Sequence, residues 1–216
     1  MAWTAALLTC YTHFFRGGWK KKIKETLKVT VTWEELEREC RECTKCKLGE
    51  TRTNCVFGCG NKNADLMFVG EAPGEKEDLS GVPFVGAAGK LFDKYLFAVD
   101  IPREDVYIAN MLKCRPPRNR DPLPEEQDIC IEYLRGQVRL IKPKMIVCLG
   151  RISAMRLIHP GYKITREHGT WVNKGGLWLT AVYHPSLLLR DPRKKDDMLI
   201  DMKSVKAKLD ELRTLS

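Results

Sequence analysis

Residues 64–74 read Ala-Asp-Leu-Met-Phe-Val-Gly-Glu-Ala-Pro-Gly, and this stretch decides the fold. Its first seven residues are almost entirely apolar, which predicts a short buried strand that ends at Gly70. The glycines and the proline that follow predict a tight loop directly after that strand. A strand without polar alternation is typical of a parallel sheet that helices cover on both faces.

The same pattern recurs along the chain, where apolar runs alternate with amphipathic segments. Further strands are predicted at residues 106–110, 144–149, 169–172 and 177–183. Helices are predicted at residues 33–43, 88–99, 125–140, 151–158 and 196–213. The first of these helices follows a capping box formed by Thr32 and Glu35. Strands that alternate with helices predict an α/β domain built on a parallel sheet.

Composition and charge limit the class of protein. With 216 residues, of which 44% are hydrophobic and 30% charged, the chain suits one globular domain rather than a disordered one. No segment approaches the roughly 18–20 uninterrupted apolar residues of a membrane span, so we expect no membrane partner. The net charge of +9 indicates an anionic partner. Subtracting the +5 of residues 1–30 leaves only +4 for residues 31–216.

Residues 1–30 differ from the rest of the chain. They contain a glycine pair and a lysine run but no amphipathic period, so we interpret them as an extension and residues 31–216 as the domain. A start codon assigned too far upstream would produce such an extension, with Val29 or Val31 as the true first residue. The apolar start has neither a preceding basic segment nor a small-residue cleavage site, so we expect a cytoplasmic protein.

The nine cysteines are clustered rather than scattered. Clustered thiols in a cytoplasmic chain bind metal more often than they form disulfides. Cys43 and Cys46, together with Cys114 and Cys130, could bind tetrahedral zinc or a [4Fe–4S] cluster. The run from Cys40 through Cys43 to Cys46 also matches a ferredoxin-like set of three ligands. Spacing alone chooses neither the ligand set nor the metal, and plain buried thiols are the third possibility.

Three loops leave the carboxyl ends of the predicted strands, where ligands of parallel α/β sheets bind. They cover residues 70–86, 110–120 and 184–190. The first loop is rich in glycine and holds Phe84, whose ring could either stack on a planar ligand or fill the core. In the third loop His184 follows a strand directly and could stabilise negative charge on a leaving group. The leucines after it are either core residues or a wedge for a base stack.

The second loop combines an amide with a dense group of positive charges. Asn110 ends a predicted strand, and its amide both donates and accepts hydrogen bonds, as reading a base edge requires. Four basic residues follow within eight positions, stiffened by two prolines: Lys113, Arg115, Arg118 and Arg120. A charge run is usually a solvated face, but one this dense at the rim of a site predicts phosphate contacts.

Several motifs occur together in a fixed order from Thr32 to the C-terminus. They are Cys43-x2-Cys46-x-Leu48-x3-Arg52, Gly70-Glu71-Ala72-Pro73-Gly74, Pro83-Phe84-Val85-Gly86-x2-Gly89, Asn110-x3-Cys114-Arg115-Pro116-Pro117-x-Asn119-Arg120, Cys130 and His184-Pro185-Ser186. In these motifs the chain resembles the family 4 uracil-DNA glycosylases, the iron–sulfur class. The resemblance does not extend to residues 1–30.

The resemblance implies a fold and a cofactor. It implies a single three-layer domain with a four-stranded parallel core sheet. It also implies a [4Fe–4S] cluster whose ligands are Cys43, Cys46, Cys114 and Cys130, with Cys40 as a spare thiol on the same helix.

The resemblance further implies roles at the site. Phe84 would stack on a uracil flipped out of DNA, Asn110 would read the pyrimidine edge and His184 would lie near uracil O2. Gly70 and Ala72 would lie in the substrate-binding loop. The remaining DNA contacts would come from the wedge residue Leu188, from Arg190 and from the four basic residues of the second loop.

The residue that orients the attacking water is less clear from the family pattern. The best-studied branch of the superfamily has an aspartate where this chain has Ala72. The nearby carboxylates are Glu71 and Glu77, and we assign the role to Glu77 because it lies between the glycine-rich motif and Phe84. Relatives that trap DNA covalently have glutamine in place of Ala72 and a histidine in the basic loop; this chain has neither, so we expect ordinary turnover.

The activity expected from these roles is hydrolysis of the N-glycosidic bond of deoxyuridine, which leaves an abasic site in DNA. We expect the enzyme to act as a monomer on uracil-containing DNA. A non-catalytic iron–sulfur or zinc nucleic-acid-binding module would explain the thiols and the basic loop, but not Asn110 and His184 at matching strand ends. A phosphate-ester enzyme would use residues 70–74 as a cradle, but the sequence has no Gly-Lys-Ser/Thr and predicts no helix start directly after them.

Overall fold

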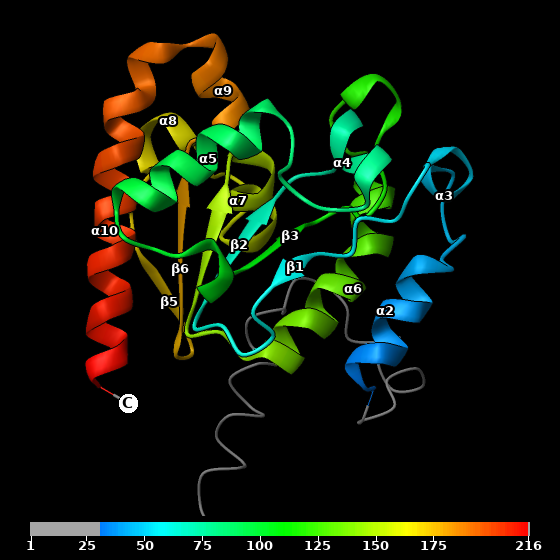
Figure 1. The fold of residues 1–216 in the computed structure, drawn as a ribbon, viewed down its shortest axis with the longest axis horizontal. Coiled ribbons are helices and arrows are strands. Elements are labelled where there is room, and N and C mark those ends of the chain that lie inside the picture. Colours follow the sequence, from blue (N-terminus) through cyan, green and yellow to red (C-terminus); the bar gives the residue numbers. More distant parts are fainter. Residues whose placement is uncertain (1–30, 216) are drawn as a thin grey trace, which may run out of the picture.

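A six-stranded sheet lies at the centre of the computed structural model, which describes residues 31–215 (Figure 1). The strand order is β1-β3-β2-β4-β6-β5. The four central strands run parallel: β3 (Tyr107–Asn110), β2 (Leu66–Gly70), β4 (Met145–Leu149) and β6 (Leu177–Val182). Two short edge strands, β1 (Cys59–Gly60) and β5 (Val172–Lys174), run antiparallel to their neighbours. The predicted α/β fold with a four-stranded parallel core is confirmed, while the extension predicted at residues 1–30 lies outside the described residues.

Helices cover both faces of this sheet (Figure 1). The longer ones are α2 (Trp33–Arg41), α5 (Ala87–Ala98), α6 (Pro124–Ile141), α7 (Arg151–Leu157) and α10 (Lys195–Thr214). The shorter ones are α3 (Leu48–Thr51), α4 (Glu75–Ser80), α8 (Ile164–Glu167) and α9 (Pro185–Arg190), with 3-10 turns η1 (Arg103–Asp105), η2 (Pro117–Asn119) and η3 (Pro192–Lys194). Within residues 31–215 no helix has both the length and the apolar character that crossing a membrane requires.

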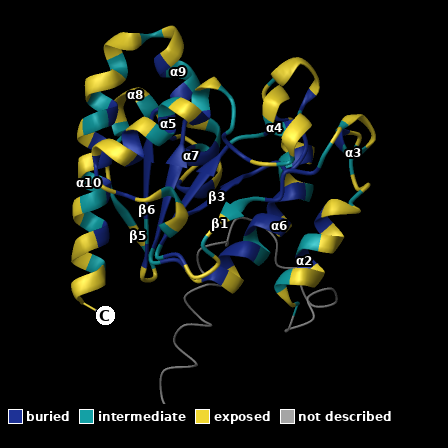
Figure 2. Cartoon of the chain, viewed as in Figure 1, coloured by how far each residue is buried: buried dark blue, intermediate teal, exposed yellow. Residues whose placement is uncertain are grey.

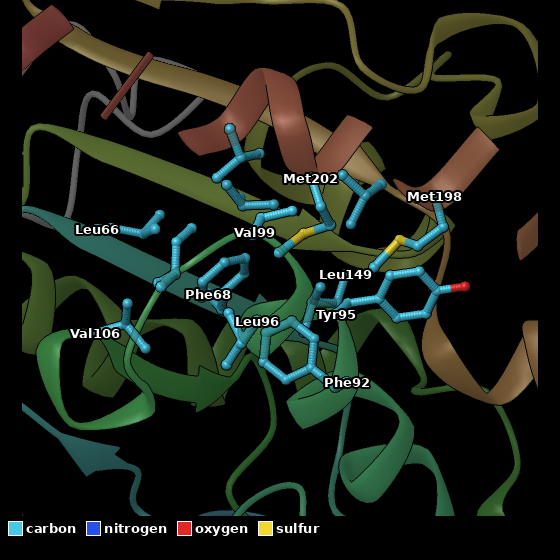
Figure 3. Packing of buried hydrophobic residues seen from close by; sticks show 14 of the residues in the cluster. Leu66, Phe68, Phe92, Tyr95, Leu96, Val99, Val106, Leu149, Met198 and Met202 are labelled. Carbon is cyan, nitrogen blue, oxygen red and sulfur yellow. The ribbon is translucent and has the colours of Figure 1, made fainter. Parts of the chain in front are cut away.

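Alternation along the strands divides the core between the two faces. Leu66 and Phe68 of β2 pack with α5, α9 and α10, and the Phe68 and Phe92 rings meet edge to face at 4.9 Å (Figure 3). Met67 and Val69 of the same strand pack with α6 and α7 on the other face. The central strands are therefore buried on both faces, which explains their continuous apolar sequence (Figure 2).

A third cluster joins α2 to α6 beside the sheet. The Thr32 hydroxyl accepts from Glu35 N–H and the Glu35 carboxylate accepts from Thr32 N–H, so the predicted capping box is present. Leu36 of α2 packs over Gly136 of α6, where a Cβ would lie 2.7 Å from the leucine Cδ2. This close approach brings Cys40 and its neighbouring thiols against α6.

The structure corrects several expected boundaries. The strand predicted at residues 169–172 lies instead at Val172–Lys174, and β1 was not predicted. Both edge strands have too few residues for a readable period. Helices α4 and α9 lie in segments predicted as loops. Because α4 begins directly after Gly74, the expectation of no helix start after residues 70–74 is wrong; the acidic first turn of α4 nevertheless opposes a bound phosphate.

Candidate active site

Phe84, Asn110 and His184 converge at the carboxyl edge of the sheet. Gly70 ends β2 in register with Asn110 at the end of β3. A Cβ on Gly70 would lie 2.3 Å from Asn110 Oδ1 and 2.8 Å from Phe84 Cζ. The absent side chain is therefore what allows the amide and the aromatic ring to approach each other.

His184 completes this group at the same edge of the sheet, from the end of β6. It follows β6, and its ring centroid lies 5.8 Å from that of Phe84 with an angle of 38° between the planes. Gly150, which follows the intervening strand β4, has φ +96° and a Cβ there would lie 2.9 Å from the His184 Cβ. The structure thus brings together three residues that were predicted from separate loops.

Asn110 is buried but keeps one free acceptor. Its side chain is 2% exposed, and Oδ1 has no hydrogen-bond partner among the described residues. A buried acceptor without a partner costs about 1–3 kcal/mol, so such groups need an explanation. An incoming donor on a ligand at this strand end would remove that cost.

The hydrogen bonds of His184 define its tautomer. Ser186 N–H donates to His184 Nδ1 at 3.1 Å, and Ser186 Oγ lies 2.7 Å from the same nitrogen. Burial, with Arg190 as a second cause, lowers the pKa of His184 to about 4. The imidazole is therefore neutral at physiological pH, and since Nδ1 accepts, its proton lies on Nε2.

Two side chains hold the backbone before and after Phe84 by hydrogen bonds. Its φ is +55°, a conformation that costs energy in a residue with a side chain. Glu77 Oε1 accepts from Val85 N–H at 3.0 Å and from Gly86 N–H at 2.8 Å. On the other side the Arg103 guanidinium donates to Pro83 O at 3.0 Å and to Phe84 O at 3.4 Å. We call this arrangement the Phe84 clamp.

The two predicted carboxylates therefore lie in different surroundings. One oxygen of Glu77 belongs to the Phe84 clamp, and its charge acts on His184. Burial, followed by the charge of Asp121, raises the pKa of Glu71 to about 7, and Arg151 opposes this shift. Ala72 packs against the cysteine cluster. Glu71 thus lies on the flank of the site, toward Asp121.

Lys113 is the clearest error among the predicted DNA contacts. Its side chain is 1% exposed, and its ammonium donates to three protein acceptors, so it is not a surface phosphate contact. Arg120 is paired bidentately with Glu126, and Arg115 donates to Asn119. Arg118 is exposed, as is Arg190 at the end of α9.

The wedge residue also needs correction. Leu188 is 0% exposed and lies in the core, because α9 turns this position toward α5 and α10. The next residue, Leu189, is 50% exposed at the same edge of the molecule.

The four predicted ligand cysteines gather between α2 and α6. Cys43, Cys46, Cys114 and Cys130 belong to one cluster, which also contains Cys40 and Cys55 with their sulfurs 3.5 Å apart. In residues 31–215 no three His, Cys, Asp or Glu side chains are arranged to hold a metal ion.

Two donors point at sulfurs of this cluster. Arg52 Nη1 donates to Cys114 Sγ at 3.2 Å, and Lys113 N–H donates to Cys130 Sγ at 3.2 Å. Burial raises the pKa of Cys114 to about 11 and that of Cys130 to about 12, and these two hydrogen bonds act in the opposite direction, toward the thiolate. Such donors suit sulfurs that carry negative charge, so the donor set fits thiolate ligands.

Sequence reasoning gave no role to two residues that shape the site. Ser186 sets the His184 tautomer, and its place two residues after the histidine, just past a proline, was an available signal. Arg103 reaches the Phe84 clamp from η1, and no sequence pattern connects it with that loop.

Comparisons with known proteins identify the family of the chain. The model of the uracil DNA glycosylase superfamily matches residues 57–204. The chain is 44% identical over 182 residues to a type-4 uracil-DNA glycosylase of Archaeoglobus fulgidus, which covers 80% of this chain and 90% of that protein. A type-4 enzyme of Thermotoga maritima is 45% identical over 161 residues, 73% of this chain and 83% of its own. A type-4 enzyme of Saccharolobus solfataricus is 41% identical over 181 residues, which cover 79% of this chain and 83% of that protein.

Proposed function

The chain belongs to the uracil DNA glycosylase superfamily and is a uracil-DNA glycosylase, and we propose that it excises uracil at the edge formed by Phe84, Asn110 and His184. The observation that carries the proposal is the buried, unpartnered Oδ1 of Asn110 at the end of β3. An enzyme acting on a base inside a duplex must first extrude that base into a pocket.

Recognition would depend on the amide and the ring together. Uracil carries a donor at N3 and an acceptor at O4, which match the Oδ1 acceptor and the Nδ2 donor of Asn110. Cytosine has an acceptor at N3 and a donor at its amino group. In the same orientation its N3 would face the Oδ1 acceptor and its amino group would face the Nδ2 donor, so neither hydrogen bond would form. Phe84 supplies the stacking surface, and the 5-methyl group of thymine would be excluded sterically. A site with buried polar groups rejects a mismatched ligand by large factors.

His184 would act on the departing base. When the glycosidic bond breaks, uracil leaves with negative charge on its ring, while the sugar gains positive charge. A neutral imidazole whose Nε2–H points at uracil O2 would stabilise that negative charge as a hydrogen-bond donor, with no change in its own protonation. We assign the free oxygen of Glu77 to the sugar or to the attacking water, because its partner oxygen is already used in the Phe84 clamp.

We propose that Cys43, Cys46, Cys114 and Cys130 hold a [4Fe–4S] cluster. Two observations support this proposal: the four cysteines belong to one group of packed side chains, and two of their sulfurs accept hydrogen bonds from Arg52 and from the Lys113 N–H. Four irons and four sulfides lie between such thiolates, so the sulfurs need not converge on one point as for zinc. The cluster would supply structural cross-linking of α2 and α6. The eight described cysteines are free, which supports a reducing compartment such as the cytoplasm.

DNA contacts are assigned to the arginines that remain at the surface. We assign these contacts to the exposed Arg118 and Arg190, and to Arg115 and Arg120, which are half-buried and hydrogen-bonded to Asn119 and Glu126 in the free protein; Leu189 replaces Leu188 as the apolar contact. The site residues all come from residues 31–216, which we assign as the glycosylase domain, acting as a monomer.

The variant Asn110→Ala tests this function. We expect excision of uracil from an oligonucleotide to fall on the order of 100-fold or more in kcat/KM, since two hydrogen bonds to the base are lost. The melting temperature should stay close to that of the parent, because Oδ1 has no hydrogen-bond partner in the described part of the chain. Abasic sites are scored after alkali treatment.

Asn63→Ala is the matched control, since this asparagine is exposed and precedes β2 at the opposite end of the sheet. Excision by Asn110→Ala at the rate of this control would refute the assignment of the site.

A further inference from the structure

A buried ammonium lies directly behind Asn110. Lys113 is 1% exposed, and its Nζ donates to Asn110 O at 2.9 Å, to Phe57 O at 3.0 Å and to Gln137 Oε1 at 2.7 Å. All three acceptors are uncharged. A buried charge is tolerated only when its hydrogen bonds are satisfied, and here the three donors of the ammonium match three acceptors.

Gln137 closes the network around this ammonium. Its Nε2 donates to Phe57 O at 2.9 Å and to Tyr107 Oη at 3.0 Å, so both ends of its amide are used. Tyr107 opens the strand that Asn110 ends. The network therefore contacts β3 at its first residue and at its last, and joins both to α6.

The backbone of Lys113 contacts the cysteine cluster. Its N–H donates to Cys130 Sγ at 3.2 Å, and the neighbouring residue, Cys114, accepts from Arg52. The main chain of this one residue thus contacts a cysteine sulfur while its side chain holds the carbonyl of the base-reading residue. No phosphate can reach this ammonium, although the sequence places it in a run of surface charges.

We propose that Lys113 is a positioning residue for uracil recognition, which fixes the backbone at Asn110 through its ammonium and so orients the Asn110 amide toward the base. This inference rests on the proposed function of Asn110. Among residues 31–215 no group hydrogen-bonds to this Oδ1 and orients it, so the backbone beneath it must supply the orientation. Gln137 acts through the same ammonium.

The test is a double-mutant cycle between positions 113 and 110. Lys113→Met keeps the length of the side chain and removes its three donors, and Lys94→Met is the matched control on the exposed face of α5. We expect Lys113→Met to lower kcat/KM for uracil excision roughly 10- to 100-fold, and the control to change nothing. If Lys113 acts through Asn110, Lys113→Met causes almost no further loss in an Asn110→Ala background.

A second readout separates positioning from structural damage. The hydrogen bond from Lys113 N–H to Cys130 Sγ comes from the backbone, so the substitution retains it. The iron bound per chain, measured by visible absorption, should therefore equal that of the parent. Losses that multiply in the double variant, or iron lost together with excision, would show a general structural role and overturn the proposal.

Gln137→Met keeps the proposal testable if Lys113→Met does not fold. It removes one acceptor of the ammonium, and its smaller loss of excision should likewise disappear in the Asn110→Ala background. Additive losses there would count against the inference. Failure of the proposed function would be recognised separately, because Asn110→Ala alone would then excise uracil at the rate of the parent.

Discussion

At the scale of single residues, the charge state of His184 determines how the site can work. A protonated imidazole would attract the DNA phosphates and the leaving base alike, whereas a neutral one acts only as a hydrogen-bond donor. Ser186 and burial together select the neutral form with its proton on Nε2. In the proposed mechanism, stabilisation of the leaving base would rely on a fixed dipole that is already oriented before the bond breaks.

This state predicts the pH behaviour of the site. A pKa lowered to about 4 means that His184 binds a proton only below that pH in the folded chain, but nearer pH 6.5 when unfolded. The unfolded state therefore binds more protons between these values, so His184 contributes stability that decreases as the pH falls from about 6.5 to 4. Nitrogen NMR of the His184 ring should show Nε2–H and no titration between pH 5 and 8; a midpoint near 6.5 would contradict the assignment.

Residue types that end strands were predictable, but burial of a charged residue was not. Asn110 and His184 follow apolar runs directly, so their place at the ligand edge follows from the strand boundaries. Lys113 lies among arginines, and its sequence neighbours predict a solvated charge. Its acceptors come from Phe57 and Gln137, which only the packing of the folded chain brings near.

At the scale of elements, α9 explains why the wedge was assigned one residue too early. The six residues of α9 are too few to show a helical period, so the sequence suggested a loop. Successive residues of a helix point about 100° apart, and this rotation turns Leu188 into the core while Leu189 faces out. The same shortness concealed α4 and β1, and it displaced the predicted bounds of β5.

The two leucines should behave differently when each is shortened. Leu188→Ala should lower the free energy of unfolding by about 2–5 kcal/mol, as for other buried leucines, in a denaturant titration. Leu189→Ala should leave stability within about 0.5 kcal/mol. We expect it to slow excision from duplex DNA roughly tenfold, and excision from single strands much less, because only the duplex must be opened. Equal losses on both substrates would argue against a wedge role for Leu189.

At the scale of the whole molecule, the net charge is a poor guide to DNA binding. Of the +9, residues 1–30 carry +5 and lie outside the described residues. Lys113 is buried, and Arg120 is neutralised by Glu126. The attraction at the site therefore depends on a few local arginines rather than on the overall field.

Removal of residues 1–30 tests this distribution. Each lost phosphate contact lowers the slope of log binding constant against log salt by about 0.9, so the six basic residues of this segment account for a change of at most about 5. We expect the chain starting at Val31 to bind non-specific DNA more weakly and with a smaller salt slope, while its kcat for uracil excision stays unchanged. Loss of excision in this chain would show that the first thirty residues belong to the catalytic domain.

The Phe84 clamp has a consequence for the order of events during damage search. Because Glu77 and Arg103 fix the backbone around the ring from opposite sides, its conformational entropy is already lost when the chain folds. If Phe84 stacks on the base as proposed, the ring offers the same surface to every extruded base and does not close around any of them. In the proposed mechanism, inspection would then be a passive comparison of shapes, and a wrong base would return to the duplex without having induced any rearrangement that must first be reversed.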